Sequence, residues 1–231
     1  MYVVLYVNDG YANIWTDAYI KRQPQARKKV LMPAMATTPQ VEAAIKSAVS
    51  MAGSSGTLIF NVGHGGTSGT GTTDGFVDLA PSKIMRLGGF NQKDVFVDVF
   101  YDMNVQGPPA ISRLDSDVKF YPDTQAAKER QARWKVYQSI SSAIKQAKLY
   151  RVVFLTCRVG SSIDFLKKIA LDWGVVIEAF KDRVVLSPQA SGNVRIHLDK
   201  DSPGFGTNIQ VSEEELPLAK EANSVRVGPP L

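Results

Sequence analysis

Two chemically reactive side chains, one imidazole and one thiol, each follow an apolar run of the chain. His64 lies between glycines in NVGHGG at 61–66, directly after the apolar run TLIFNV at 57–62. Cys157, the single cysteine of the sequence, follows the apolar run RVVFLT at 151–156. A thiolate attacks carbonyl carbon and an imidazole can accept the proton of a thiol, so the two residue types indicate thiol-based hydrolysis.

The local sequence around each residue fits these roles. Glycines on both sides of His64 let the backbone turn tightly and leave the imidazole exposed on a loop. Cys157 is expected at a strand-to-helix turn, where a helix N-terminus and the guanidinium of Arg158 both favour thiolate. Two plainer interpretations stay open: an inert buried thiol, and a loop histidine bonded to backbone. His197 alternates with apolar residues and is expected to be a solvent-facing strand residue.

Strands and helices alternate along the sequence and must position these side chains. Apolar runs predict strands at 2–7, 57–62, 95–100, 151–156 and 175–180. Helices are expected from the cap Thr38 to Gly53, over 124–148, and from a cap at Ser161 or Ser162 to Gly174. Residues 11–36 show no clean period and are expected to be irregular, and 63–75 reads as a glycine-rich loop. Short strands are possible at 183–186 and 194–198.

This alternation predicts an α/β fold with a mostly parallel central sheet and helices on both faces. The carboxyl ends of neighbouring parallel strands share one edge of a sheet, so His64 and Cys157 could meet there. The length of 231 residues predicts a single domain over 1–231, with an insertion at about 103–123 and a loose tail from about 217.

The composition of the chain limits its expected cellular location and the kinds of partner it binds. There is no apolar run of membrane-spanning length, and the N-terminus reads as a first strand rather than a signal peptide, so a cytoplasmic protein without membrane contact is expected. One cysteine excludes an internal disulfide and a multi-cysteine zinc site. The formal net charge is +5, and the basic residues cluster at 21–22, 27–29 and 128–135. Only Trp134 and Tyr137 place aromatic rings among these basic residues, so nucleic-acid binding is not favoured.

Two other kinds of ligand site are weaker alternatives. The loop from Gly63 to Gly75 lacks the Gly-Lys-Ser/Thr ending of a phosphate-binding loop, and no amphipathic helix directly follows it. Asp98 and Asp102 straddle a predicted strand end, where a carboxylate is more typical of a turn or cap than of a metal ligand. No metal site is therefore predicted, and the sequence gives no signal for an oligomeric state.

Two segments, LIFNVGHG at 58–65 and VVFLTCR at 152–158, resemble the caspase-like (clan CD) cysteine peptidases, which include caspases, metacaspases, separase and CHAT domains. In that family one apolar strand ends in a His-Gly pair and a later one ends in the nucleophilic cysteine. DGFVDL at 74–79 is similar to the Asp-Gly that often follows the histidine loop. The resemblance covers roughly 57–87 and 150–180. It departs from the caspase pattern in LTCRVG at 155–160 and in a separation of 93 residues (157 − 64), where about 50 is usual.

The resemblance implies a caspase-like three-layer α/β sandwich and a cysteine endopeptidase acting on protein or peptide substrates without metal or organic cofactor. It implies Cys157 as nucleophile and His64 as general base and acid. It further implies backbone N–H groups of Gly65 and Cys157 as the oxyanion hole, and Asp74 and Arg158 as substrate-binding residues. Two alternatives remain: a non-catalytic interaction domain of the same fold, and a doubly wound domain that binds a small molecule through the Gly63–Gly75 loop.

Overall fold

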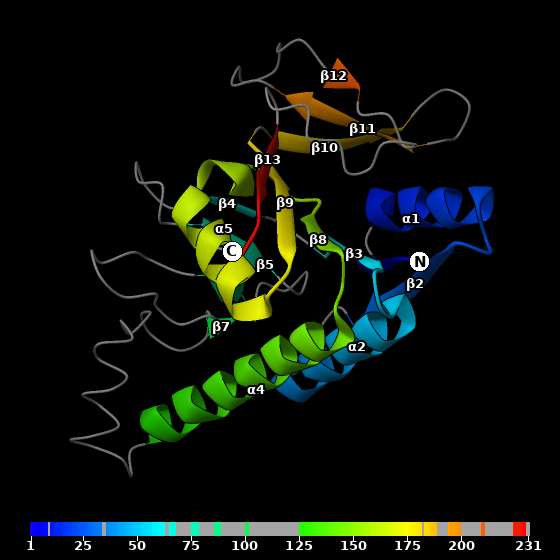
Figure 1. The fold of residues 1–231 in the computed structure, drawn as a ribbon. Coiled ribbons are helices and arrows are strands. Elements are labelled where there is room, and N and C mark those ends of the chain that lie inside the picture. The colour runs from blue at the N-terminus through cyan, green and yellow to red at the C-terminus, as the bar shows by residue number, and fades with distance from the viewer. Residues whose placement is uncertain are drawn as a thin grey trace.

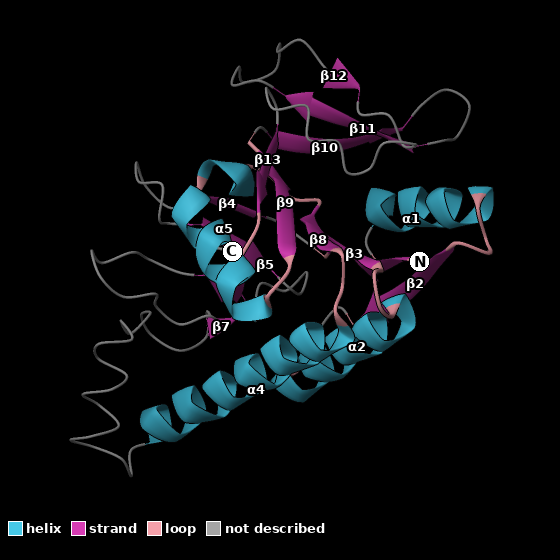
Figure 2. Ribbon diagram, viewed as in Figure 1, coloured by secondary structure: helices cyan, strands magenta, loops and turns pink. Residues whose placement is uncertain are grey.

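The computed structural model describes residues 1–8, 10–33, 36–62, 65–67, 75–78, 86–88, 100–101, 125–181, 183–188, 194–199, 209–210 and 224–229. Within these residues the chain is an α/β protein with a six-stranded sheet and four α-helices (Figure 2). The helices are α1 (Gly10–Arg22), α2 (Thr38–Ala52), α4 (Gln125–Ala147) and α5 (Ile163–Trp173).

The central sheet has the strand order β13-β9-β8-β3-β1-β2. Its strands are β1 (Tyr2–Val7), β2 (Arg27–Met32), β3 (Thr57–Asn61), β8 (Arg151–Phe154), β9 (Val176–Phe180) and β13 (Ser224–Val227). All neighbours pair in parallel except β13, which runs antiparallel to β9. The predicted mostly parallel sheet is therefore confirmed.

Helices cover both faces of this sheet (Figure 1). One face packs against α2, α4 and α5 in a large apolar cluster, in which Phe60 and Phe154 lie 5.4 Å apart and Trp173 of α5 lies 6.1 Å from each ring. The opposite face packs against Trp15 and Tyr19 of α1 in a second cluster. The aromatic triplet joins β3 to β8 below their carboxyl ends, which fixes the two strands that precede His64 and Cys157.

Two smaller antiparallel sheets accompany the central one. The first consists of β4 (Gly65–Thr67), β5 (Gly75–Asp78), β6 (Arg86–Gly88) and β7 (Phe100–Tyr101), and the second of β10 (Arg183–Pro188), β11 (Val194–Asp199) and β12 (Ile209–Gln210). The segment 63–75 is thus not one continuous loop, because it contains β4. Residues 183–186 belong to β10, which pairs with β11 outside the central sheet.

The prediction that residues 11–36 are irregular was wrong, since they contain α1 and β2. The helix buries Ala12, Trp15, Thr16 and Tyr19, at the three- and four-residue spacing of a single helical face. A threonine and two aromatic residues carry this face, and all three have modest helix propensity, which hid the period. In β2, Lys28 and Lys29 are exposed on an edge strand, where charge is common.

The C-terminal segment also differs from expectation. Ser224–Val227, within the tail expected to be loose from about 217, forms β13 and pairs with β9. The predicted insertion at 103–123 and most of the predicted strand 95–100 lie outside the described residues. Among the described helices, none combines the length and apolar character needed to span a bilayer.

Candidate functional site

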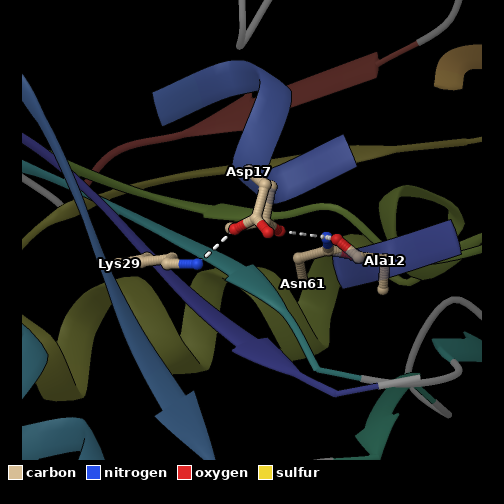
Figure 3. A network of polar contacts seen from close by, with 5 residues as sticks. Ala12, Asp17, Lys29 and Asn61 are labelled. Carbon is tan, nitrogen blue, oxygen red and sulfur yellow. Dashed lines mark hydrogen bonds and ion pairs between the residues drawn. The ribbon is translucent and has the colours of Figure 1, made fainter. Parts of the chain in front are cut away.

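The carboxyl end of β3 is fastened to α1 by a buried amide. Asn61, the last residue of β3, is 5% exposed, and its Nδ2 donates to the Ala12 carbonyl at 3.4 Å and to Thr16 Oγ1 at 3.2 Å (Figure 3). On the exposed side of the same helix, Lys29 of β2 forms an ion pair with Asp17. The point from which the chain leaves β3 toward His64 is therefore fixed by hydrogen bonds as well as by packing.

The carboxyl end of β8 leads into a strained turn. Leu155 N–H donates to the Phe60 carbonyl at 3.0 Å, which extends the pairing of β8 with β3 beyond Phe154. Cys157 follows and is partly buried. Arg158 then takes φ 55° and ψ 3°, the left-handed region that costs an ordinary side chain roughly 1 kcal/mol. Strain of this kind is concentrated at functional sites.

A short 3-10 helix, η1 (Val159–Ser161), follows Arg158 and is held against the end of β9. A Cβ on Gly160 would lie 2.7 Å from the Ala179 carbonyl oxygen, so only glycine allows this approach. Ser161 Oγ donates to the Lys181 carbonyl at 3.1 Å. The loop after Cys157 is therefore positioned by contacts with the backbone of β9 and of Lys181, which follows it.

The segments that follow the two reactive residues pack against each other. Strand β4, which begins at Gly65, contacts η1, and so does its partner β5. Val77 of β5 and Val159 of η1 are both fully buried in the larger apolar cluster. His64 itself lies outside the described residues.

Of the remaining residues considered in the sequence analysis, some lie within the described part of the chain and some lie outside it. Gly65 lies in β4 opposite Val77. His197 lies in β11 opposite Val185 and Gln210, in a strand as predicted. Asp74 and the pair Asp98 and Asp102 lie outside the described residues. Within the described part of the chain, no group of three or more His, Cys, Asp or Glu residues is placed to hold a metal ion.

The thiol has a hydrogen-bond acceptor that the sequence did not reveal. Cys157 Sγ lies 3.3 Å from the carbonyl oxygen of Val184 in β10 and donates to it. Ser162 precedes α5 as predicted, but its side chain makes no capping hydrogen bond. The 3-10 helix η1 stands between Cys157 and Ile163, the first residue of α5. Because a helix dipole acts mainly within its first turn, α5 gives little support for a thiolate. The Val184 carbonyl favours the protonated thiol.

Two buried hydroxyl groups flank Cys157 and η1 along the chain. Thr156 and Ser162 are at most 2% exposed, and neither Thr156 Oγ1 nor Ser162 Oγ has a hydrogen-bond partner among the described residues. Buried hydroxyls normally find partners, so these groups add polarity on either side of Cys157 and η1. Polar residues at the ends of apolar runs, such as Asn61 and Thr156, were the signal in the sequence.

This arrangement combines a partly buried sulfur three residues after β8, a left-handed backbone beside it, and a neighbouring strand, β3, that ends three residues before His64. The geometry allows nucleophilic chemistry at Cys157 once its hydrogen bond to Val184 is broken. In comparisons with known proteins, no protein-family model, no curated protein and no solved structure matches this chain.

Proposed function

We propose that this protein is a cysteine endopeptidase in which Cys157 is the nucleophile and His64 is the general base and acid. The observation that carries the proposal is the parallel pairing of β3 with β8 as direct neighbours. The chain leaves both strands at the same edge of the sheet. His64 is three residues beyond Asn61, the end of β3 (64 − 61), and Cys157 is three beyond Phe154, the end of β8 (157 − 154).

Two further observations support this assignment. The contact of β4 with η1 joins the segment that begins one residue after His64 to the segment that begins two residues after Cys157. A backbone tether this short on both sides favours a small separation between imidazole and thiol. The left-handed conformation of Arg158 adds strain next to the nucleophile, as expected where a sharp turn exposes a reacting side chain.

The proposed reaction follows from these two side chains. His64 accepts the thiol proton, and the Cys157 sulfur forms a bond to the scissile carbonyl carbon. The imidazolium then donates its proton to the amide nitrogen as the C–N bond breaks, which releases the amine and leaves a thioester. His64 next accepts a proton from water, whose oxygen attacks the thioester carbon. The C–S bond then breaks, which releases the acid, and the imidazolium returns the proton to the departing Cys157 thiolate.

The resemblance to caspase-like peptidases supplies the remaining roles as proposals. Backbone N–H groups of Gly65 and Cys157 would stabilise the oxyanion. In other enzymes, removal of one such donor lowers the catalytic rate by about 10²–10³-fold. Asp74 and Arg158 would contact the substrate. The mostly parallel sheet with helices on both faces is compatible with a caspase-like layered fold.

Peptide cleavage tests the proposal. Purified protein is incubated with a complex peptide mixture and new termini are identified by mass spectrometry, with Cys157→Ala, His64→Ala and the distant control Ser139→Ala in parallel. We expect cleavage by the unmodified chain and by Ser139→Ala, and a loss of at least about 10²-fold in the two site variants. Cleavage that persists in Cys157→Ala would overturn the assignment of the nucleophile.

One observation favours a second candidate, a non-catalytic interaction domain of the same fold. The hydrogen bond from Cys157 Sγ to the Val184 carbonyl stabilises a protonated thiol. A chain that has lost turnover has no need of a thiolate. Absence of cleavage together with slow alkylation of Cys157, unaffected by His64→Ala, is the result that this candidate predicts.

A further inference from the structure

The loop that carries Cys157 is held at three points by one neighbouring segment, the β9–β10 corner (residues 179–181 and 183–184). Gly160 lies against the backbone of Ala179 and Phe180, Ser161 Oγ donates to the Lys181 carbonyl, and Cys157 Sγ donates to the Val184 carbonyl. The first two contacts position the loop. The third acts on the reactive atom itself.

We propose that the β9–β10 corner is a latch on the thiol: in the resting protein the Val184 carbonyl holds Cys157 as a protonated thiol, and displacement of β10 releases it for reaction. The inference rests on the proposed function, because a latch regulates only a thiol that acts. It adds the regulation of that site, through movement of β10 rather than through a change in Cys157 or His64.

The chemistry of the contact explains how the latch works. A thiol can donate its proton to a carbonyl oxygen, whereas a thiolate has no proton to donate and would face the negative end of the carbonyl dipole. With the Val184 carbonyl 3.3 Å from the sulfur, ionisation therefore costs the hydrogen bond and adds a repulsion. A peptide bond can be attacked only after the sulfur and this carbonyl have separated.

The attachment of β10 shows what the latch responds to. Val184 packs against the apolar cluster beneath α1, and both β10 and β11 contact α1. The β10–β11 hairpin is absent from the central sheet, so it can shift without breaking the pairing of β8 with β3. A substrate or partner that moves this hairpin from α1 would free the thiol.

The test compares alkylation of Cys157 by iodoacetamide at neutral pH in the full chain and in matched variants. Ser161→Ala removes one hydrogen bond that holds the corner without changing the thiol. Ser139→Ala removes a shorter hydrogen bond, 2.7 Å to the Glu42 carboxylate, between α4 and α2. One hydrogen bond is worth about 1 kcal/mol, so Ser161→Ala should raise the rate up to about five-fold, while Ser139→Ala leaves it unchanged.

A backbone variant tests the carbonyl directly. Replacing Val185 with its α-hydroxy acid converts the amide after Val184 into an ester, whose carbonyl is a weaker acceptor, and keeps every side chain. The latch predicts faster alkylation in this protein too. Equal rates in the unmodified and ester proteins would overturn it, even if Ser161→Ala is faster, because the corner would then act by shielding alone.

Peptide cleavage measured on the same samples separates the two proposals. Faster alkylation in the Ser161→Ala and ester variants, without cleavage in any sample, supports the latch and contradicts the peptidase. Cleavage that depends on Cys157, with alkylation equal in all variants, supports the peptidase and overturns the latch.

Discussion

Buried polar groups near the two ends of strand β8 differ in whether they have charged or hydrogen-bonding partners. At the amino end, Arg151 Nη1 reaches to 3.6 Å from Oε1 of Glu178 in β9, whose side chain is 3% exposed, and Arg226 Nε lies 3.4 Å from the same oxygen. Arg151 also donates to Thr57, and Arg226 to the Tyr150 hydroxyl at 2.9 Å. Opposite charges and hydroxyl groups compensate one another there, although Glu178 Oε2 has no hydrogen-bond partner among the residues that the structure describes.

At the carboxyl end, polar groups lack such compensation. The Thr156 and Ser162 hydroxyls are buried without hydrogen-bond partners in the described part of the chain, and Arg158 adopts a left-handed backbone. Stability alone would favour removing each of these features, whereas the charge cluster at the other end would be harmed by removing either sign. Substitutions at the amino end should therefore change stability alone, whereas those at the carboxyl end should also change reactivity.

The largest expected effect is at the amino end. Glu178→Ala leaves the guanidinium of Arg151, whose side chain is 14% exposed, without its buried counter-charge, and should lower the free energy of unfolding by about 3 kcal/mol. Asp17→Ala breaks an exposed pair with Lys29 and should cost under about 1 kcal/mol. Urea denaturation measures both. Equal effects would show that the cluster is not structural.

Gly160→Ala should have the next largest effect, because its Cβ would meet the Ala179 and Phe180 backbone at 2.7 Å. Overpacking of this kind costs about 1–3 kcal/mol, and here it would also displace η1. Gly228→Ala is the matched control, since no atom of the described residues lies within 4 Å of its added Cβ. A Gly160→Ala protein as stable as Gly228→Ala would contradict the packing of η1 against β9.

The pH dependence of stability sharpens the comparison through Glu178. Burial raises the pKa of this carboxyl group, and Arg151 and Arg226 only partly offset the rise. The folded chain thus binds a proton that the unfolded chain has released above the ordinary glutamate pKa, and stability from this group falls as pH rises through the folded pKa. We compare the free energy of unfolding of Glu178→Gln with that of the unmodified protein. The difference, variant minus unmodified, should not change with pH below the ordinary glutamate pKa, and should grow between that pKa and the raised pKa of the folded state. Calorimetry at several pH values measures it, and a flat difference throughout would contradict the raised pKa.

The smallest expected change in stability is at Arg158. Arg158→Gly relieves the left-handed strain and should raise the free energy of unfolding by about 0.5 kcal/mol, the relief minus the entropy cost of glycine. Lys148→Gly, at φ 52° after α4, should stabilise similarly. Only Arg158→Gly should reduce peptide cleavage. If both variants cleave as well as the unmodified chain, the strain beside Cys157 has no function.

The sequence predicted the elements whose pattern is strong and local. The apolar runs at β1, β3, β8 and β9 and the face of α5 were visible because buried parallel strands and amphipathic helices have simple patterns. Helix α1 was missed because threonine and aromatic residues carry its buried face, and β13 because a short edge strand depends on its partner β9. The Val184 contact with Cys157 could not be predicted, since it joins backbone and sulfur across a tertiary corner.

Coupling between His64 and Cys157 is the central claim, and its most direct test is the ratio of alkylation rates in the unmodified chain and His64→Ala at about pH 6. An ordinary imidazole, with a pKa of about 6.5, is largely protonated there, and an imidazolium beside the sulfur favours thiolate by a factor of about ten or more. We predict that His64→Ala slows the alkylation of Cys157 by about ten-fold. Equal rates would contradict the dyad.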